Sequence, residues 1–272
     1  MRSSRILTRR DWLSAAGLLT LAGCAGQTKE EPIWVGHIGP AGKRDESAIN
    51  GMQQTLADLR EREVTIAGRT IGVRHVEAND KSRARAEASR LLSVNRVACL
   101  IVGPGVEGVA DVVAIARSHG ALAVLLDGTA DRTLADQALV LDLDPQTRGE
   151  MLARFESAKE KRDEEVWTRR MQPDPASLPP EGRAWVERYE KRFGARPDDE
   201  AILGADAIAL IADGLREIAG DDRRKLAEEL MGRSEIAGLT GPITRKDGRT
   251  IRPMWVERTV KGVRVGVEAV PN

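Results

Sequence analysis

The fold is decided by the stretch from Val97 to Asp127, which reads VACLIVGPGVEGVADVVAIARSHGALAVLLD. Two wholly apolar runs, Val97–Val102 and Ala121–Leu126, bracket a helical pattern that ends at Gly120. A continuous apolar run is typical of a strand buried on both faces, and such strands belong to parallel sheets with helical crossovers. The stretch therefore predicts a β-loop-α-β unit whose two strands are parallel neighbours.

The loops at the carboxyl ends of these strands are the predicted binding site, because ligands of parallel α/β folds gather there. One loop is Gly103–Gly108, a second begins at Asp127, and the loop after the first strand of the domain begins at Gly39. The expected ligand-binding residues are Gly39, Pro40, Gly103, Pro104, Gly105, Glu107, Asp127, Gly128 and Thr129.

Composition narrows the classes of partner. The chain has 272 residues, with 42 Lys and Arg residues against 42 Asp and Glu residues. This balance argues against nucleic acid, whose phosphates need a basic face. An aromatic content of 3% argues against a surface on which bases stack.

The histidines and cysteines suggest neither a metal site nor catalysis. His37, His75 and His119 are isolated in the sequence, without the spacing typical of metal ligands, so we expect no metal and no cofactor. Cys99 lies inside an apolar strand and is interpreted as a small buried hydrophobic residue. None of these residues has a partner that indicates a nucleophile and its base, so no catalytic residue is expected.

Residues 1–23 resemble an export signal. Arg9-Arg10 suits twin-arginine export, and the apolar core Trp12–Ala22 is too short to remain as a membrane anchor. Leu21-Ala-Gly-Cys24 is typical of a lipoprotein signal. Cys24 is therefore predicted to be the lipidated first residue of a protein on the periplasmic face of the bacterial envelope, with residues 24–32 as its tether and the lipid as its only membrane contact.

Alternating strand and helix patterns from residue 33 to residue 147 predict one doubly wound α/β lobe, with a mostly parallel sheet flanked by helices. Ser47 is expected to cap the helix after the first strand. The expected strands are residues 33–38, 70–76, 97–102, 121–126 and 139–143.

The rest of the chain is different. The pattern Thr147-Arg-Gly-Glu150 is that of a capping box and predicts a charged helix to about Arg162. The segment 148–180 contains no convincing buried strand, and four prolines near its end predict an extended linker. Helices are predicted over 181–242, and a change to a period of two predicts a β ribbon over 243–272.

Short motifs follow one another along the chain in a defined order. They are Ile38-Gly-Pro-Ala-Gly42, Gly68-Arg69, Asn79-Asp80-Lys81-Ser82, Val102-Gly-Pro104, Asp144-Pro145, Tyr189-Glu-Lys-Arg-Phe-Gly194 with Pro197, Asp206-Ala207, and Leu239-Thr-Gly-Pro-Ile243 with Asp247-Gly248. No single motif is specific. Their order and spacing resemble type I periplasmic solute-binding proteins of the branched-chain amino-acid (leucine-binding) class, over Ile33 to about Leu143 and Arg183 to about Gly262.

The resemblance implies a non-catalytic receptor, a clamp of two lobes that closes on a small polar solute such as an amino acid and delivers it to an ABC permease. The chain departs from this pattern in three places. Glu107 stands where the family usually has serine, and Ala205 where it usually has tyrosine. A full second lobe needs on the order of 100 residues, and 148–180 offers about a third of that. We therefore expect a reduced second lobe, the remnant at 148–180, and weak, open binding.

Two alternatives remain open. Gly103-Pro-Gly-Val-Glu-Gly108, with Asp127 about 20 residues later, satisfies the dinucleotide fingerprint and favours an exported NAD(P)-dependent oxidoreductase. Against it, Pro104 removes an N–H donor and Glu107 adds negative charge near the phosphate position. The second alternative is an envelope scaffold or sensor lipoprotein that has lost solute binding and binds another envelope protein.

Overall fold

The computed structural model describes residues 31–129, 132–157, 165–169, 178–261 and 263–270. The chain divides into residues 1–31 and residues 32–272, and every element named below belongs to the second unit. The predicted signal peptide, Cys24 and most of the tether lie outside the described residues. Within the described part of the chain, no helix combines the length and apolar character needed to cross a membrane.

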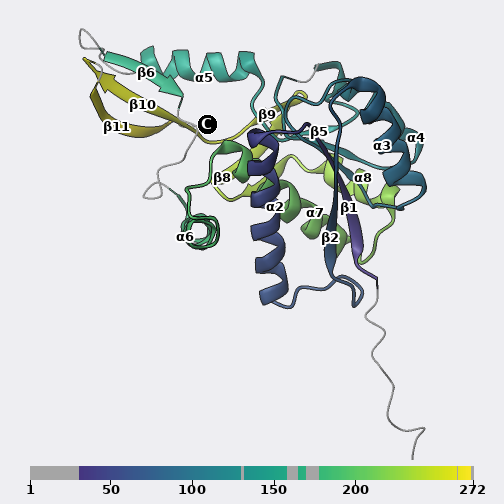
Figure 1. Cartoon of the computed structure of the whole chain (residues 1–272). Helices are drawn as coiled ribbons and strands as arrows, with labels where there is room; N and C mark the ends of the chain where they lie inside the picture. Colours follow the sequence, from purple (N-terminus) through teal and green to yellow (C-terminus); the bar gives the residue numbers. More distant parts are fainter. Residues whose placement is uncertain (1–30, 130–131, 158–164, 170–177, 262, 271–272) are drawn as a thin grey trace, which may run out of the picture. The chain divides into compact units, whose positions relative to one another are not determined.

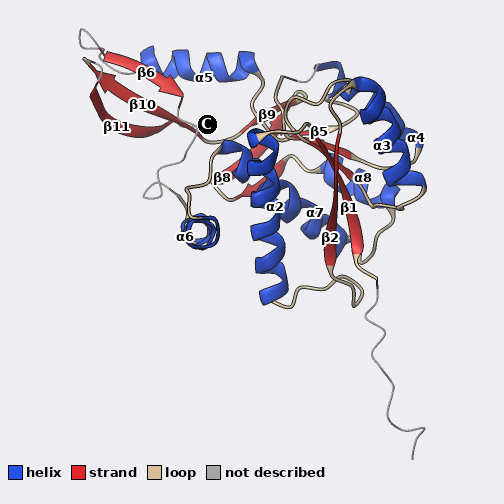
Figure 2. Ribbon diagram, viewed as in Figure 1, coloured by secondary structure: helices blue, strands red, loops and turns tan. Residues whose placement is uncertain are grey.

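The core of the fold is a five-stranded parallel sheet with the order β2-β1-β3-β4-β5 (Figure 1, Figure 2). β3 and β4 pair in parallel, with Ile101 opposite Val124, which confirms the prediction from the two apolar runs. The strand order reverses between β1 and β3, and ligands of doubly wound folds bind at such a switch point. The strands are β1 (Ile33–Gly39), β2 (Ile71–Glu77), β3 (Leu100–Val102), β4 (Ala123–Leu125) and β5 (Leu139–Val140).

Helices cover both faces of this sheet, because successive strand residues point to opposite faces. One face, with Ile101 and Val124, packs against α2, α7 and α8. The opposite face, with Leu100 and Leu125, packs against α3 and α4. The helices are α2 (Lys43–Glu61), α3 (Lys81–Ser93), α4 (Val109–Ser118), α5 (Pro145–Ser157), α6 (Pro180–Phe193), α7 (Asp199–Glu217) and α8 (Arg223–Gly232), with a short 3₁₀ helix, η1 (Arg132–Leu134).

Two small antiparallel sheets take the place of the single ribbon predicted over 243–272. One has the order β7-β8-β9 and the other β11-β10-β6. The sequence predicts no convincing buried strand in 148–180, and the structure has an edge strand there, β6. Its backbone pairs with β10, which supplies the hydrogen bonds that a short segment cannot make alone. These strands are β6 (Glu165–Arg169), β7 (Glu235–Gly238), β8 (Gly241–Lys246), β9 (Arg249–Ile251), β10 (Met254–Val260) and β11 (Val263–Val270).

Two helices begin earlier than their sequence patterns predict. Ser47 lies inside α2, which begins four residues before it, so this serine is not the cap. α5 begins two residues before Thr147. The reason is Asp144, whose carboxylate accepts hydrogen bonds from the N–H groups of Gln146 (3.0 Å) and Thr147 (2.9 Å) and thereby caps the helix. The predicted extension of this helix to Arg162 lies outside the described residues.

Candidate functional site

The carboxyl ends of β3 and β4 enclose a hollow of about 270 Å³. Four of the nine predicted ligand-binding residues line it, namely Gly103, Gly105, Asp127 and Thr129. The apolar side chains of Val102, Val106, Val109 and Leu125 form much of the remaining wall. A hollow that combines apolar side chains with a few polar groups is typical of a small-molecule site, and this volume suits a small solute.

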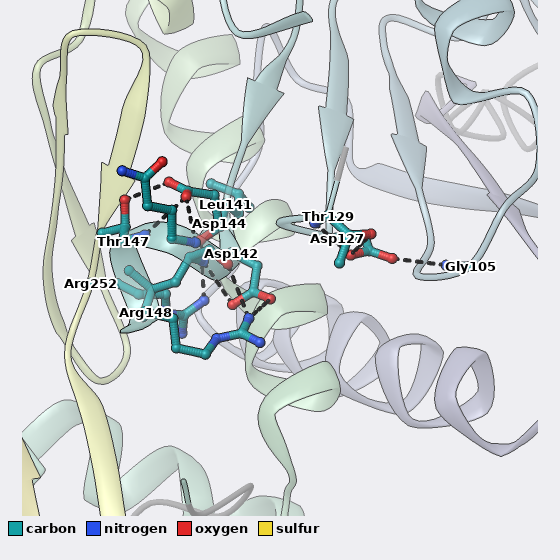
Figure 3. Close-up of polar contacts among 11 residues, drawn as sticks. Gly105, Asp127, Thr129, Leu141, Asp142, Asp144, Thr147, Arg148 and Arg252 are labelled. Carbon is teal, nitrogen blue, oxygen red and sulfur yellow. Dashed lines mark hydrogen bonds and ion pairs between the residues drawn. The ribbon is translucent and has the colours of Figure 1, made fainter. Parts of the chain in front are cut away.

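Asp127 organises the polar side of this hollow, as Figure 3 shows. One carboxylate oxygen accepts a hydrogen bond from the backbone N–H of Gly105 (3.2 Å). The other oxygen accepts from the N–H (2.9 Å) and the hydroxyl (2.7 Å) of Thr129. Asp127 therefore joins the two strand-end loops and places negative charge at the hollow.

The glycines of the dinucleotide-like motif have structural explanations. Gly105 (φ +81°) and Gly108 (φ +72°) adopt left-handed backbone conformations that favour glycine. A Cβ atom on Gly103 would lie 2.6 Å from a carboxylate oxygen of Asp45. Because the side chain of Asp127 accepts hydrogen bonds from the N–H groups of Gly105 and Thr129, this acidic residue holds the two strand-end loops together and is not directed at a ribose. The geometry does not support the dinucleotide alternative.

The other five predicted residues do not line the hollow. Gly39 and Gly128 are glycines because other atoms lie against them. A Cβ atom would fall 1.8 Å from the carboxylate of Asp45 at Gly39, and 2.1 Å from the carbonyl oxygen of Leu143 at Gly128. Their contact with a ligand stays a prediction. The remaining three are the partly buried Pro40, the buried Pro104 and the exposed Glu107.

A polar cluster of the buried His37 and Asp45 with the exposed His75 was not anticipated from the sequence. In the parallel pairing of β1 and β2, His37 lies opposite His75, so these two histidines are not isolated as expected. Their Nδ1 atoms are 2.8 Å apart. The two histidines become neighbours when the two predicted strands are aligned in parallel with Ile33 opposite Ile71, and this alignment is the sequence signal for the pair.

Burial controls the charges of this cluster. It lowers the pKa of His37 to about 3, an effect that neighbouring His75 reinforces, and it also lowers the pKa of His75. Burial raises the pKa of Asp45 to about 7, and the charge of Glu77 adds to that effect. Both imidazoles are therefore neutral at neutral pH. The Asp45 carboxylate lies against Gly39 and Gly103, so it fills the crevice at the switch point between β1 and β3.

A second polar group lies beyond β5, where the chain enters α5 (Figure 3). The guanidinium of Arg148 donates to the carboxylate of Asp142 at 3.0 Å. The guanidinium of Arg252 pairs with Asp206 of α7 at 3.2 Å, with side chains only 7% and 1% exposed. It also donates to the carbonyl oxygen of Leu141 at 3.5 Å. These charges are paired with one another, which indicates a structural role.

A larger hollow of about 460 Å³ lies between α2, α6 and β7. Two of its charged groups bind each other, because Arg188 donates to the two carboxylate oxygens of Asp58 at 3.0 and 2.8 Å. The indole N–H of Trp185 donates to the hydroxyl of Thr55 at 3.3 Å. This hollow includes no residue of the strand-end loops, and we favour the hollow beside Asp127.

Comparison with known proteins points to one class. Residues 164–263 match the family described as "Periplasmic binding protein". No curated protein matches the chain in sequence.

Several solved structures are similar to this chain. The branched-chain amino acid transporter substrate binding protein LivJ from Streptococcus pneumoniae, in complex with isoleucine, is 12% identical, with 88% of this chain and 99% of LivJ covered and a TM-score of 0.64. A putative branched-chain amino acid ABC transporter from Rhodospirillum rubrum is 12% identical and has a TM-score of 0.67. The alignment covers 86% of this chain and 99% of that protein. A solute binding protein from R. palustris in complex with benzoate is 15% identical and has a TM-score of 0.60. The alignment covers 89% of this chain and 98% of that protein.

These likenesses establish the fold. The chain has an α/β fold like that of type I periplasmic binding proteins, structurally similar to the solute-binding proteins of branched-chain amino-acid ABC transporters. Both comparisons lead to binding proteins, which are non-catalytic, and this agrees with the expectation from the sequence.

Proposed function

We propose that this chain is an extracytoplasmic, lipid-anchored solute-binding protein of the branched-chain amino-acid ABC transporter class, with an ABC permease as its partner. The observation that carries the proposal is the hollow of about 270 Å³ at the carboxyl ends of β3 and β4. It lies at the carboxyl ends of parallel strands, next to the switch point between β1 and β3, and apolar side chains surround a single organised carboxylate. The lipid on Cys24 is the proposed membrane attachment.

The charge of the hollow favours a solute that presents an amino group. Asp127 supplies negative charge inside it, and the exposed Glu107 lies on the other strand-end loop, Gly103–Gly108. The N–H of Gly105, which would suit a ligand carboxylate, already donates to Asp127. A carboxylate ligand that enters here meets like charge, whereas an ammonium group gains an ion pair in a partly apolar setting. We therefore favour amino acids and related amines over aromatic acids.

The small sheet β11-β10-β6, with α5, is the proposed remnant of the second lobe. Leu143, Met151, Met254 and Val256 form its own apolar cluster, separate from the clusters on the two faces of the parallel sheet. Three strands and one helix form a small wall compared with a full lobe of about 100 residues. Binding in the hollow is consequently expected to be open and weaker than in a closing clamp.

One observation favours the scaffold alternative. The crevice between β1 and β3, the position at which doubly wound folds hold ligands, is filled by the protein's own Asp45. A chain that binds no solute there would retain the fold as a surface for another envelope protein. Purification from mild detergent separates the two functions, because recovery of an ABC permease supports transport and recovery of a different envelope protein supports the scaffold.

A thermal-shift screen of the full chain tests solute binding. The ligands are L-amino acids, small amides and amines, and benzoates, each at concentrations up to 10 mM. A ligand at 100 times its Kd stabilises the folded state by about 2.7 kcal/mol, which is roughly 5–11 °C for a chain of this size. We expect such shifts from amino-bearing solutes and smaller ones from benzoates.

Matched variants locate the binding. Asp127→Asn removes the charge at the hollow and should abolish the ligand-induced shift, whereas Glu187→Gln, at an exposed position of α6, should leave it unchanged. If none of the ligands moves the melting temperature of the unmodified chain, solute binding is wrong and the scaffold function takes its place.

A further inference from the structure

The cluster of His37, Asp45 and His75 brings three metal-ligating side chains together at one end of β1 and β2. Ligand atoms of the three residues all lie within 4.8 Å of one another. The Nε2 atom of His37 is 3.4 Å from one oxygen of Asp45, and the Nε2 atom of His75 is 3.6 Å from the other. Among the described residues, these three are the group of histidine, cysteine and acidic side chains whose ligand atoms lie close enough together to hold one metal ion.

Two buried polar atoms of this cluster, one nitrogen and one oxygen, have no hydrogen bond. The side chains of His37 and Asp45 are 0% and 3% exposed, and neither Nε2 of His37 nor Oδ1 of Asp45 has a hydrogen-bond partner. The contact between the two Nδ1 atoms requires one protonated and one unprotonated nitrogen. The ring with the protonated Nδ1 then directs an unprotonated Nε2 toward the carboxylate. A cation between nitrogen and oxygen satisfies both acceptors.

The distances fit a small transition-metal ion. With Zn–N and Zn–O bonds of about 2.0–2.1 Å, two ligand atoms on a tetrahedron lie about 3.3 Å apart. The observed separations of 3.4 and 3.6 Å are close to that value. Two imidazoles and one carboxylate suit zinc, copper, nickel and iron, whereas calcium and magnesium prefer oxygen ligands alone.

The surroundings add negative charge and a route of entry. Glu77 follows His75 by two residues on β2, so its side chain leaves the strand on the same face, and its charge acts on both Asp45 and His75. Two neutral imidazoles and two carboxylates favour a dication. When both rings present an unprotonated Nε2 to the ion, both Nδ1 atoms carry hydrogen and must separate. The side chain of His75 is 30% exposed, so it can turn away from the partner ring.

We propose that His37, Asp45 and His75 bind one divalent transition-metal ion of the zinc class, with Glu77 supporting the site from outside. The ion joins β1, β2 and the first turn of α2. It lies at the switch point beside Gly103, next to the hollow at Asp127. The proposal does not depend on solute binding, because zinc binding is measured without any solute.

The test is calorimetric titration of the untagged full chain with Zn²⁺ at pH 7.5, together with metal analysis after dialysis. The expected result is one Zn²⁺ per chain with a Kd below about 10 μM. His75→Ala and Asp45→Asn should each weaken binding at least tenfold. His119→Ala, at an exposed histidine after α4, and Cys24→Ser should bind like the unmodified chain.

A spectroscopic readout separates coordination from nonspecific binding. Co²⁺ should give visible absorption bands that Zn²⁺ displaces, and these bands should be absent from His75→Ala. Circular dichroism verifies the fold of each variant, and if His75→Ala does not fold, His75→Gln replaces it. The proposal is overturned if the unmodified chain binds no Zn²⁺, if folded His75 and Asp45 variants bind as tightly as it does, or if His119→Ala removes the binding.

Discussion

The buried ion pair between Asp206 and Arg252 offers a sharp test of how the small sheets are attached to the parallel sheet. Asp206 lies on α7 and accepts hydrogen bonds from the guanidinium of Arg252 (3.2 Å) and from the N–H of Leu239 (2.8 Å). Asp206→Asn keeps the shape of the side chain and the acceptor for Leu239. It removes the charge opposite Arg252, whose side chain is only 7% exposed.

An unpaired charge at this depth is costly. Breaking a buried ion pair by removing one partner typically destabilises a protein by about 3–5 kcal/mol. For a chain of this size each kcal/mol lowers Tm by about 2–4 °C, so the expected loss is roughly 6–20 °C. Urea unfolding followed by tryptophan fluorescence measures the change in the free energy of unfolding.

Two further variants decide whether the charge is the cause. Asp213→Asn on the same helix removes the partner of Arg233 at a site 43% exposed, and should cost less than about 1 kcal/mol. Asp206→Leu combined with Arg252→Met should recover most of the stability, since an apolar pair avoids the burial of charge. The reasoning is refuted if Asp206→Asn costs no more than Asp213→Asn.

Three other predictions follow from close contacts, helix geometry and burial. Gly128→Ala should destabilise the fold by about 1–3 kcal/mol, because its Cβ would fall 2.1 Å from the carbonyl oxygen of Leu143. Gly149→Ala should stabilise the fold by about 0.5–1 kcal/mol, because this residue lies inside α5 and its added Cβ would meet no atom within 4 Å. Urea unfolding measures both changes. A shift of both variants in the same direction would contradict this reasoning. Burial raises the pKa of the Cys99 thiol to about 12. In a Cys24→Ser chain at pH 8, this thiol should therefore react with a disulfide reagent only after unfolding. Rapid reaction of the folded chain would contradict the burial of Cys99.

The parallel sheet was predictable because its signal is local. The central strands β3 and β4 are short apolar runs with turn residues beside them, and burial on both faces requires such runs. The aromatic stripe of α6 was equally readable, since Trp185 and Tyr189 occupy one helical face and both are buried, and Gly194 ends the helix with φ +69°. In these segments the sequence pattern and the tertiary contacts demand the same residues.

What could not be predicted depends on pairing between distant segments. β6 is a short edge strand that exists through its hydrogen bonds to β10, about 90 residues later, and nothing in its own composition indicates that partner. The cluster of His37 and His75 depends on the register between β1 and β2. The role of Asp127 in holding the Gly103–Gly108 loop appears only when β3 and β4 are placed side by side.

Amide NMR of the ¹⁵N-labelled full chain tests where a solute binds. The titrant is the amino-bearing solute with the largest thermal shift. We expect the chemical-shift changes to concentrate at the N–H groups of Gly105 and Thr129, which both donate to Asp127, and to be absent from Asp127→Asn. Changes confined to the hollow around Trp185, or none at any concentration, would contradict a solute site at the carboxyl ends of β3 and β4.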